Sequence, residues 1–186
     1  VELINLHGFE NFNMRKLGNH LGVAPKTVYN YYQNKDELYL NILAKGFREL
    51  YVRCRDAYYK GDSPLERLKS MAWEYMEFGV SQSNYYNLMF TWQVPKYQDY
   101  AETSLEPLAK VELNTSLELL MLFVNAVREV GENISEEEAR FYVIYFWSLL
   151  HGYLSGYNNT LLNYMHENPL SLQKRIFETL MENLEH

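Results

Sequence analysis

The chain has 186 residues, of which 47% are apolar and 16% are aromatic, enough material for the core of one or two small folded domains. Its single cysteine, Cys54, excludes an intrachain disulfide and a cysteine-based metal cluster. No apolar run approaches the roughly 20 residues that a membrane-spanning helix needs. These features predict a cytoplasmic protein with no membrane partner.

The formal net charge of -7 is unevenly distributed along the chain. Residues 1–60 hold nine Lys or Arg against six Asp or Glu, giving +3, whereas residues 61–186 hold eight against eighteen, giving -10. A basic end on an acidic body is typical of a protein that offers only one end to a polyanion. We therefore expect the N-terminal third to carry any contact with nucleic acid.

The N-terminal segment predicts two short helices. Gly8 follows an apolar stretch and stops the first helix, and Asn13 is a good N-cap for the second. Met14, Leu17 and Leu21 then recur at helical spacing. This spacing predicts that the three side chains share the inner face of the second helix.

A tight turn then leads into a third helix. Gly22 suits the positive φ of such a turn, Val23 is expected to fill the angle between the helices, and Pro25 suits a first helical turn. In the helix that follows, roughly residues 25–32, Val28 and Tyr32 can face inward, while Lys26, Thr27, Asn30 and Tyr31 stand where a core would want apolar residues. A surface of this kind can meet phosphates and base edges in a DNA groove.

Residues 8–38 resemble the helix-turn-helix of the TetR family of bacterial and archaeal transcriptional regulators. The matching residues are Gly8-Phe9, Asn13, Gly22-Val23, Thr27-Val28-Tyr29, Tyr31-Tyr32 and Lys35-Asp36-Glu37-Leu38. Asn13, Gly18 and Ala24 depart from the pattern, since the family usually has Thr, Ala and Ser there. Gly18 in a helix interior costs about 1 kcal/mol relative to Ala, so the second helix must rely on its packing.

The resemblance implies a helix-turn-helix DNA-binding domain over residues 1–46, with a truncated N-terminus, and a ligand-binding and dimerisation domain over residues 47–183. The expected fold is all-α with about nine helices, in which a three-helix head is joined by a long helix to a helical body. Residues 184–186, Leu-Glu-His, look like an expression-tag scar.

Helical periodicity continues through the rest of the chain, with no alternating run long enough to predict a strand. The expected helices span residues 35–59, 63–81, 84–94, 104–130, 136–158 and 168–184, with a polar, Tyr-rich connection at 95–103. Ser135 and Glu138 have capping-box spacing. Cys54 falls on an apolar stripe, which predicts burial. Trp73 falls on the polar side of its helix, where it packs on the head, meets a partner or lies on the surface.

The resemblance and the residue types together assign the contacts with double-stranded DNA. The expected DNA-binding residues are Asn13, Met14, Pro25, Lys26, Thr27, Tyr29, Asn30, Tyr31 and Lys35. Lys26, Thr27 and Asn30 are the candidates for base edges, and Tyr29 and Tyr31 for phosphate or a thymine methyl group. The ammonium of Lys35 and the backbone near residues 13 and 14 are expected to hold phosphates.

Aromatic, methionine and histidine side chains gather in the segments where the family has its ligand cavity. The candidates are Tyr75, Phe78, Tyr86, Met89, Phe90, Trp92, Phe123, Trp147 and His151. Such a lining favours a flat or greasy small-molecule effector, although each of these residues also fits a core. Trp147, His151 and Gly152 resemble the signature of one TetR subgroup. His151 is either a satisfied core histidine or a group that bonds a ligand or a haem iron.

Small residues on the penultimate predicted helix suggest close approach by another helix. Ser148, Gly152 and Gly156 recur every four residues beside Phe141 and Tyr145. The resemblance places the homodimer interface on the last two helices, so we expect these five residues there, with packing inside one chain as the alternative. A two-fold dimer places its two recognition helices about 34–36 Å apart, one turn of DNA.

These features predict a ligand-responsive transcriptional regulator, most simply a repressor that binds a palindromic operator as a homodimer and that a small hydrophobic or aromatic ligand releases. Activation by ligand stays open. The chain has no zinc-protease, phosphate-loop or nucleophile-elbow motif, so we expect no enzyme activity, cofactor or metal site. The alternatives are a haem or small-molecule sensor in which DNA binding is secondary, and a purely structural helical dimer.

Overall fold

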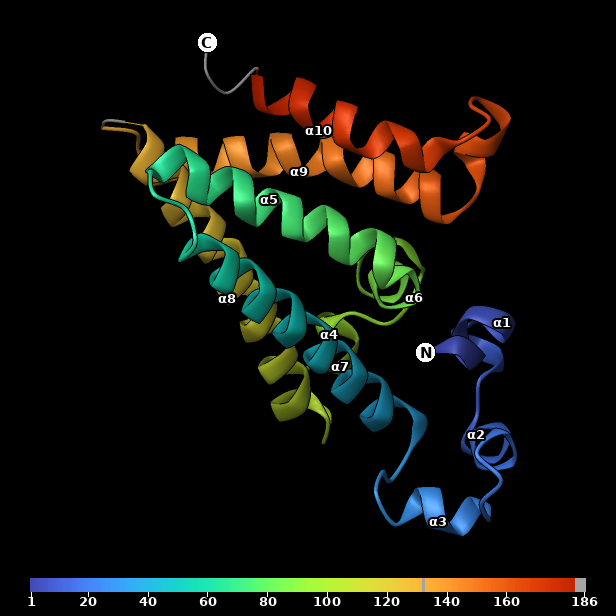
Figure 1. The fold of residues 1–186 in the computed structure, drawn as a ribbon. Coiled ribbons are helices and arrows are strands. Elements are labelled where there is room, and N and C mark those ends of the chain that lie inside the picture. The colour runs from blue at the N-terminus through green and yellow to red at the C-terminus, as the bar shows by residue number, and fades with distance from the viewer. Residues whose placement is uncertain (132, 183–186) are drawn as a thin grey trace. The chain divides into compact units, whose positions relative to one another are not determined.

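The computed structural model describes residues 1–131 and 133–182, and all regular structure in this part of the chain is helical (Figure 1). The all-α prediction is confirmed. Ten α-helices occur in the described residues, one more than expected, because the predicted connection at 95–103 contains the short helix α7 (Tyr97–Tyr100). The suggested tag scar at 184–186 lies outside the described residues.

The chain forms two compact units that do not follow the order of the sequence. The first consists of residues 1–49 and 84–117, and the second of residues 50–83 and the chain from 118 onward. Two long helices, α4 (Lys35–Tyr58) and α8 (Glu106–Val130), begin in the first unit and end in the second.

The first unit opens with the predicted helix-turn-helix. Helix α1 (Glu2–Asn11) is interrupted at Gly8, which has a φ of 72°. Asn13 caps α2 (Met14–His20) by accepting a hydrogen bond from the Lys16 amide at 2.9 Å. Gly22 turns the chain with a φ of 67°, and α3 (Pro25–Tyr29) follows. The stop, the cap and the turn agree with the sequence-based expectation.

Packing between α2 and α3 differs from the prediction in its side chains. Leu21 and Val23, expected inside, are 59% and 38% exposed. The turn instead closes through its backbone, because the Val23 amide donates to the Gly18 carbonyl at 2.9 Å. A Cβ on Gly18 would lie 3.1 Å from the Val23 oxygen and 3.2 Å from the Pro25 Cα. The absence of a side chain at Gly18 thus lets the turn lie directly on α2, which leaves Leu21 and Val23 outside.

In the rest of the first unit, residues 84–100 pack against the first half of α4. Helix α6 (Ser83–Tyr86) continues into the π-helix η1 (Asn87–Thr91). An added Cβ on Gly46 would lie 2.8 Å from the Met89 sulfur, so α4 approaches η1 without room for a larger residue. The rings of Phe47 and Phe90 meet edge to face at 5.4 Å between centroids.

The second unit packs α5 (Pro64–Ser81), α9 (Glu136–Asn158) and α10 (Gln173–Glu182) together, with the 3-10 segments η2 (Leu161–Tyr164) and η3 (Pro169–Leu172) between the last two (Figure 1). The Ser135 hydroxyl accepts the Glu138 amide at 3.1 Å and begins α9 as expected. Helices α5 and α9 meet where Leu154 covers Gly79, leaving no space there for a side chain.

Helix α10 packs on α5 and covers the side chain of Trp73. The Trp73 and Phe177 rings meet edge to face at 5.1 Å, so this tryptophan packs on the last helix of its own chain. The Gln173 amide also donates to the Glu77 carboxylate at 2.6 Å. Cys54 is fully buried, and burial raises the pKa of its thiol, in agreement with a packing role.

Candidate nucleic-acid interface and effector site

Helix α3 has one buried residue, Val28, and exposes a polar and aromatic surface on its other sides. Val28 is 6% exposed and holds the helix against the unit. Tyr29 and Tyr31 are 52% and 76% exposed. The other exposed candidates are Lys26, Thr27 and Asn30, the last of which is the C-cap residue. The predicted base-reading residues therefore stand together on an accessible surface.

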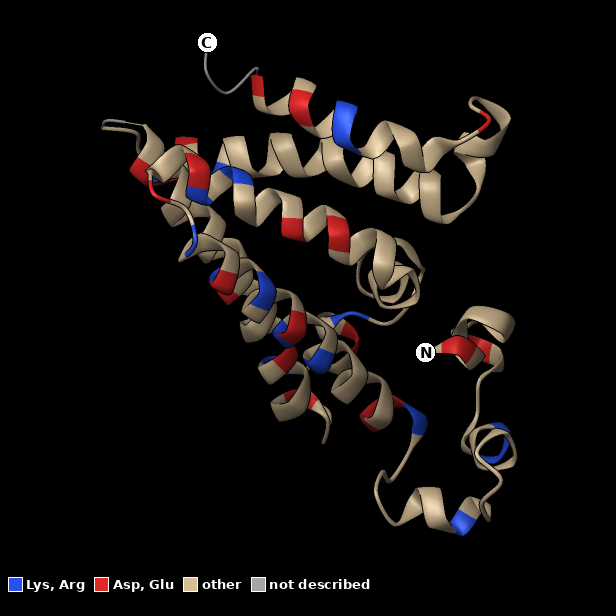
Figure 2. Cartoon of the chain, viewed as in Figure 1, with Lys and Arg blue, Asp and Glu red and all other residues tan. Residues whose placement is uncertain are grey.

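The charge around this surface is more polarised than the division of the chain at residue 60 suggests. Residues 11–35 contain Arg15, Lys16, Lys26 and Lys35 but no Asp or Glu, so that these cations stand on and beside α2 and α3 (Figure 2). Arg15 is exposed on the first turn of α2 and was not among the predicted DNA-binding residues. A charge count over the motif alone would have found it.

At the start of α2, the backbone rather than the side chains is left to contact a phosphate. Met14 is 3% exposed, and the side chain of Asn13 already accepts the Lys16 amide. The Lys16 ammonium donates to the Asn11 carbonyl oxygen at 2.8 Å. The contacts expected of residues 13 and 14 are therefore left to their backbone N–H groups.

Lys35 stands at the first turn of α4, directly after the recognition segment. Its ammonium lies 4.6 Å from the centroid of the Phe9 ring, a cation-π contact that ties α4 to α1. The turn is fixed by a reciprocal cap, because Asn34 accepts the Glu37 amide at 2.8 Å and the Glu37 carboxylate accepts the Gln33 amide at 2.6 Å. The cation is thus held at a defined place beside α3.

The nine predicted effector-binding residues divide between the two units. Tyr75, Phe78, Phe123, Trp147 and His151 belong to the second unit, and Tyr86, Met89, Phe90 and Trp92 belong to the first.

Within the second unit, the candidates on α5 and α9 touch one another. The Trp147 indole donates to the Tyr75 hydroxyl at 2.8 Å, and the Trp147 ring stacks on His151 with 4.8 Å between centroids. Burial lowers the pKa of His151, because desolvation disfavours the charged imidazolium. These contacts form an aromatic cluster with the His151 imidazole at one end.

Within the first unit, the candidates lie on and around η1. Tyr86 is fully buried, and its ring lies 5.0 Å from that of Phe90. Asn87 on the same segment is 5% exposed, and its side-chain oxygen has no hydrogen-bond partner. The hydroxyl oxygen of Thr91 is also buried and without a partner. Sequence reasoning missed both, although a polar pair one turn apart inside an apolar run was the available signal.

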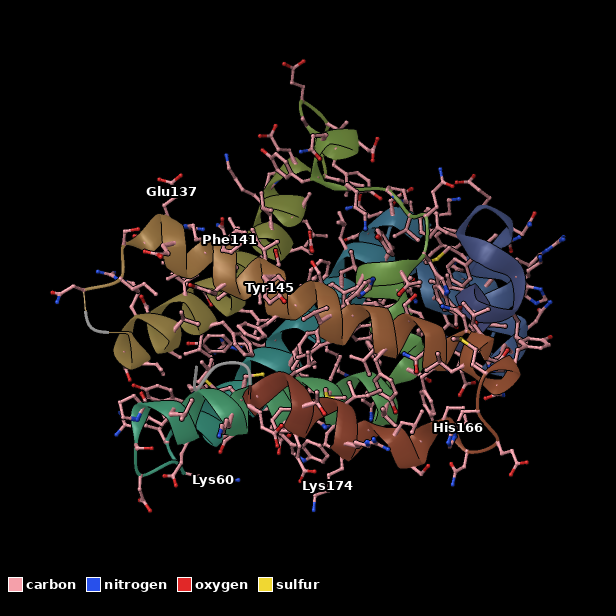
Figure 3. All side chains as sticks on the ribbon, turned by 90° about the horizontal axis from the view of Figure 1, so that it is seen from above. Lys60, Glu137, Phe141, Tyr145, His166 and Lys174 are labelled. Carbon is pink, nitrogen blue, oxygen red and sulfur yellow. The ribbon has the colours of Figure 1, made fainter. Side chains whose placement is uncertain are left out.

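The predicted dimer residues of α9 do not share one environment. Phe141 and Tyr145 are 61% and 49% exposed and lie along one side of α9 (Figure 3). Gly152 is exposed, with open space where a Cβ would stand, whereas Gly156 is buried against Leu162 of its own chain. The further exposed members of this face are Ile144, Ser148 and Leu149.

Membrane spans and metal clusters are both absent from the described part of the chain. Among residues 1–131 and 133–182, no helix is long and apolar enough to cross a bilayer. The same part of the chain contains no group of three or more His, Cys, Asp or Glu side chains arranged to hold a metal ion.

Two models of known protein families match the chain, one at its N-terminal end and one over its C-terminal region. Residues 1–42 match the model of bacterial regulatory proteins of the tetR family, and residues 68–184 match that of the tetracyclin repressor-like C-terminal domain. The chain belongs to the TetR family of transcriptional regulators. Its helix-turn-helix is therefore the DNA-binding element of a TetR regulator, and its C-terminal region is the family's ligand-binding domain.

Solved structures of TetR-like fold resemble the whole chain. The fatty acid degradation regulator FadR from Bacillus halodurans superimposes with a TM-score of 0.70 at 16% identity, over 100% of this chain and 92% of that one. FadR from Bacillus subtilis in complex with stearoyl-CoA gives 0.68 at 15%, over 97% and 92%. The TetR family regulator PfmR from Thermus thermophilus gives 0.70 at 13%, over 97% and 93%. No curated protein sequence matches this chain.

Proposed function

We propose that this TetR family protein is a homodimeric repressor that binds a palindromic operator and is released by a small apolar or aromatic effector. The observation that carries the proposal is the exposed polar face of α3 inside residues 11–35, a stretch with four cationic side chains and no acidic one. Phosphate neutralisation requires cations at the contacting surface, and base reading requires exposed polar side chains there.

In this proposal the accessible residues of α3 and of the two positions after it divide the recognition between them. Lys26, Thr27 and Asn30 read base edges in the major groove, while Tyr29 and Tyr31 contact phosphate or a thymine methyl group. Lys35 holds a phosphate from the first turn of α4, and Arg15 adds a phosphate contact from α2. Residues 1–46 then act as the DNA-binding domain and residues 47–183 as the effector and dimerisation domain.

The exposed face of α9 supports the homodimer. Three large apolar side chains, Phe141, Ile144 and Tyr145, are each about half exposed or more on one side of a 23-residue helix. A contiguous apolar face of this kind marks an interaction surface. A second copy of the chain is the occupant we propose, because a two-fold dimer supplies the two recognition helices that a palindrome requires. Gly156 belongs to intrachain packing and is left out of the proposed interface.

In this proposal, the effector changes operator affinity through the contact between η1 and α4. Four of the nine candidate residues lie on residues 86–92, and Met89 on this segment packs against Gly46 of α4. Helix α4 in turn starts a few residues after α3. An effector that binds one arrangement of this segment better than another will shift the position of α4 and lower operator affinity. That FadR from Bacillus subtilis was solved with stearoyl-CoA is consistent with an apolar ligand in such a fold.

Fluorescence anisotropy tests the proposal directly. The protein is titrated against labelled DNA from upstream of its own gene and against a scrambled duplex, over a series of salt concentrations. We expect selective, salt-sensitive binding to the upstream DNA. The variant Asn30→Ala should then relax the preference at particular base pairs, with a loss of about 1–3 kcal/mol for each contact removed. An absence of binding to either duplex at every salt concentration would contradict the proposed operator.

A further inference from the structure

Two buried oxygen atoms on η1 lack hydrogen-bond partners. They are the side-chain oxygen of Asn87, a residue 5% exposed, and the hydroxyl oxygen of Thr91. Most buried polar groups in proteins are paired, because an unpaired one loses its water without compensation. Two unpaired oxygens on one five-residue segment therefore suggest a hydrogen-bond partner that comes from outside the chain.

The two groups share one side of the segment. Residues four apart on a helix lie on the same face, whereas residues two apart point to nearly opposite sides. Asn87 and Thr91 are four apart, and Met89 midway between them packs toward Gly46 of α4. The polar pair thus faces away from α4, on a segment whose neighbours along the chain are Tyr86, Phe90 and Trp92.

The helix that carries the pair is itself unusual. Residues 87–91 form a π-helix, closed by a hydrogen bond from the Trp92 amide to the Asn87 carbonyl oxygen at 2.8 Å. Single turns of π-helix occur frequently at functional sites, where the wider turn displaces a side chain from the regular position. This turn places two polar side chains of one face within a largely apolar environment.

We propose that Asn87 and Thr91 are the polar anchor of the effector site and that they bind an uncharged hydrogen-bond donor, a hydroxyl group above all, on an otherwise apolar or aromatic molecule. The inference rests on the proposed effector site and deepens it by naming the polar group of the ligand. An amide oxygen accepts only, and a threonine hydroxyl both accepts and donates, so a ligand hydroxyl satisfies both. Neither side chain carries a charge that would offset a charged ligand in a buried position.

The first test uses stability and needs no ligand. Thr91→Val replaces the unpaired hydroxyl by a methyl group of similar size. Asn87→Leu replaces the side-chain amide by an apolar group of similar shape. We expect the melting temperature of the free protein to stay level or to rise by about 2–4 °C, since an orphaned group is removed. The control is Gln173→Met, because Gln173 is 7% exposed and pairs with Glu77 at 2.6 Å, and its melting temperature should fall. A fall in Thr91→Val that equals the fall in the control would overturn the proposal, because the hydroxyl would then have a partner in the free protein.

The second test uses two probes that differ in one group, 2-naphthol and 2-methylnaphthalene. Equilibrium dialysis of the full chain without DNA should give roughly tenfold tighter binding of 2-naphthol, the value of one hydrogen bond made in a buried site. Thr91→Val and Asn87→Leu should each reduce that preference, whereas Gln173→Met should keep it. Equal affinity for both probes, binding of neither, or an unchanged preference in both variants would refute the proposal. Because the dialysis contains no DNA, a failure of operator binding would count against the proposed function alone.

Discussion

The hydroxyl of Tyr39, a fully buried residue in the second turn of α4, donates a hydrogen bond to the carbonyl oxygen of Pro95 at 3.0 Å. The Tyr39 ring also meets Phe9 of α1 at 4.7 Å between centroids. One side chain thus connects the DNA-binding head, α4 and the segment that follows η1, all within the first unit. Tyr100 adds a second link, because its hydroxyl donates to the Asp36 carboxylate at 3.0 Å.

Tyr39→Phe should weaken this junction without removing its packing. The change leaves the Pro95 carbonyl without its donor, and we expect a loss of about 1–3 kcal/mol in the free energy of unfolding, measured by urea denaturation. Tyr31→Phe is the control, since Tyr31 is 76% exposed, and should change stability very little. If the proposed coupling runs through this junction, Tyr39→Phe will also reduce the effect of the effector on operator affinity. Equal stability of Tyr39→Phe and the unmodified protein would show that the bond contributes nothing.

Lys35→Met should weaken binding to all DNA sequences alike. The methionine retains the apolar contact with Phe9 but loses the ammonium, so one phosphate contact is removed. We expect the slope of log affinity against log salt to fall by about one unit, measured by anisotropy on specific and scrambled duplexes. Lys174→Met, which removes a cation of α10 that pairs with Glu178, should leave the slope unchanged. An unaltered slope in Lys35→Met would exclude Lys35 from phosphate contact.

Phe141→Glu tests the proposed dimer face. A carboxylate in the centre of an apolar interface loses its hydration without gaining a partner, so the dimer dissociation constant should rise roughly tenfold or more. Light scattering after size-exclusion chromatography would report the shift toward monomer. Tyr164→Glu is the control, because Tyr164 is 89% exposed but lies outside α9. It should leave the dimer dissociation constant unchanged. A Phe141→Glu protein that stays dimeric at low concentration would move the interface elsewhere.

The burial of His151 predicts a dependence of stability on pH. Its pKa lies below the ordinary value of 6.5 in the folded protein, so the unfolded chain binds the proton more tightly. Stability is therefore fully present above that value and falls as the pH drops below it. We expect His151→Gln to flatten the fall in melting temperature between about pH 7 and pH 5. His7→Gln serves as the control for losing an exposed histidine. Parallel pH curves for His151→Gln and the unmodified protein would contradict the assignment.

Local chemistry determined much of this molecule in advance. Asn13, Ser63 and Ser135 each cap the helix that follows them, and Gly8 and Gly22 each adopt the positive φ for which glycine is suited. These signals act over a few residues, so the sequence by itself shows them, and with the TetR motif they determined the helical architecture and the DNA-binding head.

Packing over long sequence distances was decided only by the tertiary structure. Helical periodicity predicted Leu21 inside, and the turn was expected to place Val23 in the angle between the helices, but the turn backbone approaches Gly18 closely and both side chains lie outside. Trp73 lies on a polar face and is half-buried, and Phe177, far along the chain, packs on it. The unpaired oxygens of Asn87 and Thr91 were also decided by tertiary structure. Whether a polar group has a partner depends on every element that packs against it, and no local sequence pattern contains that information.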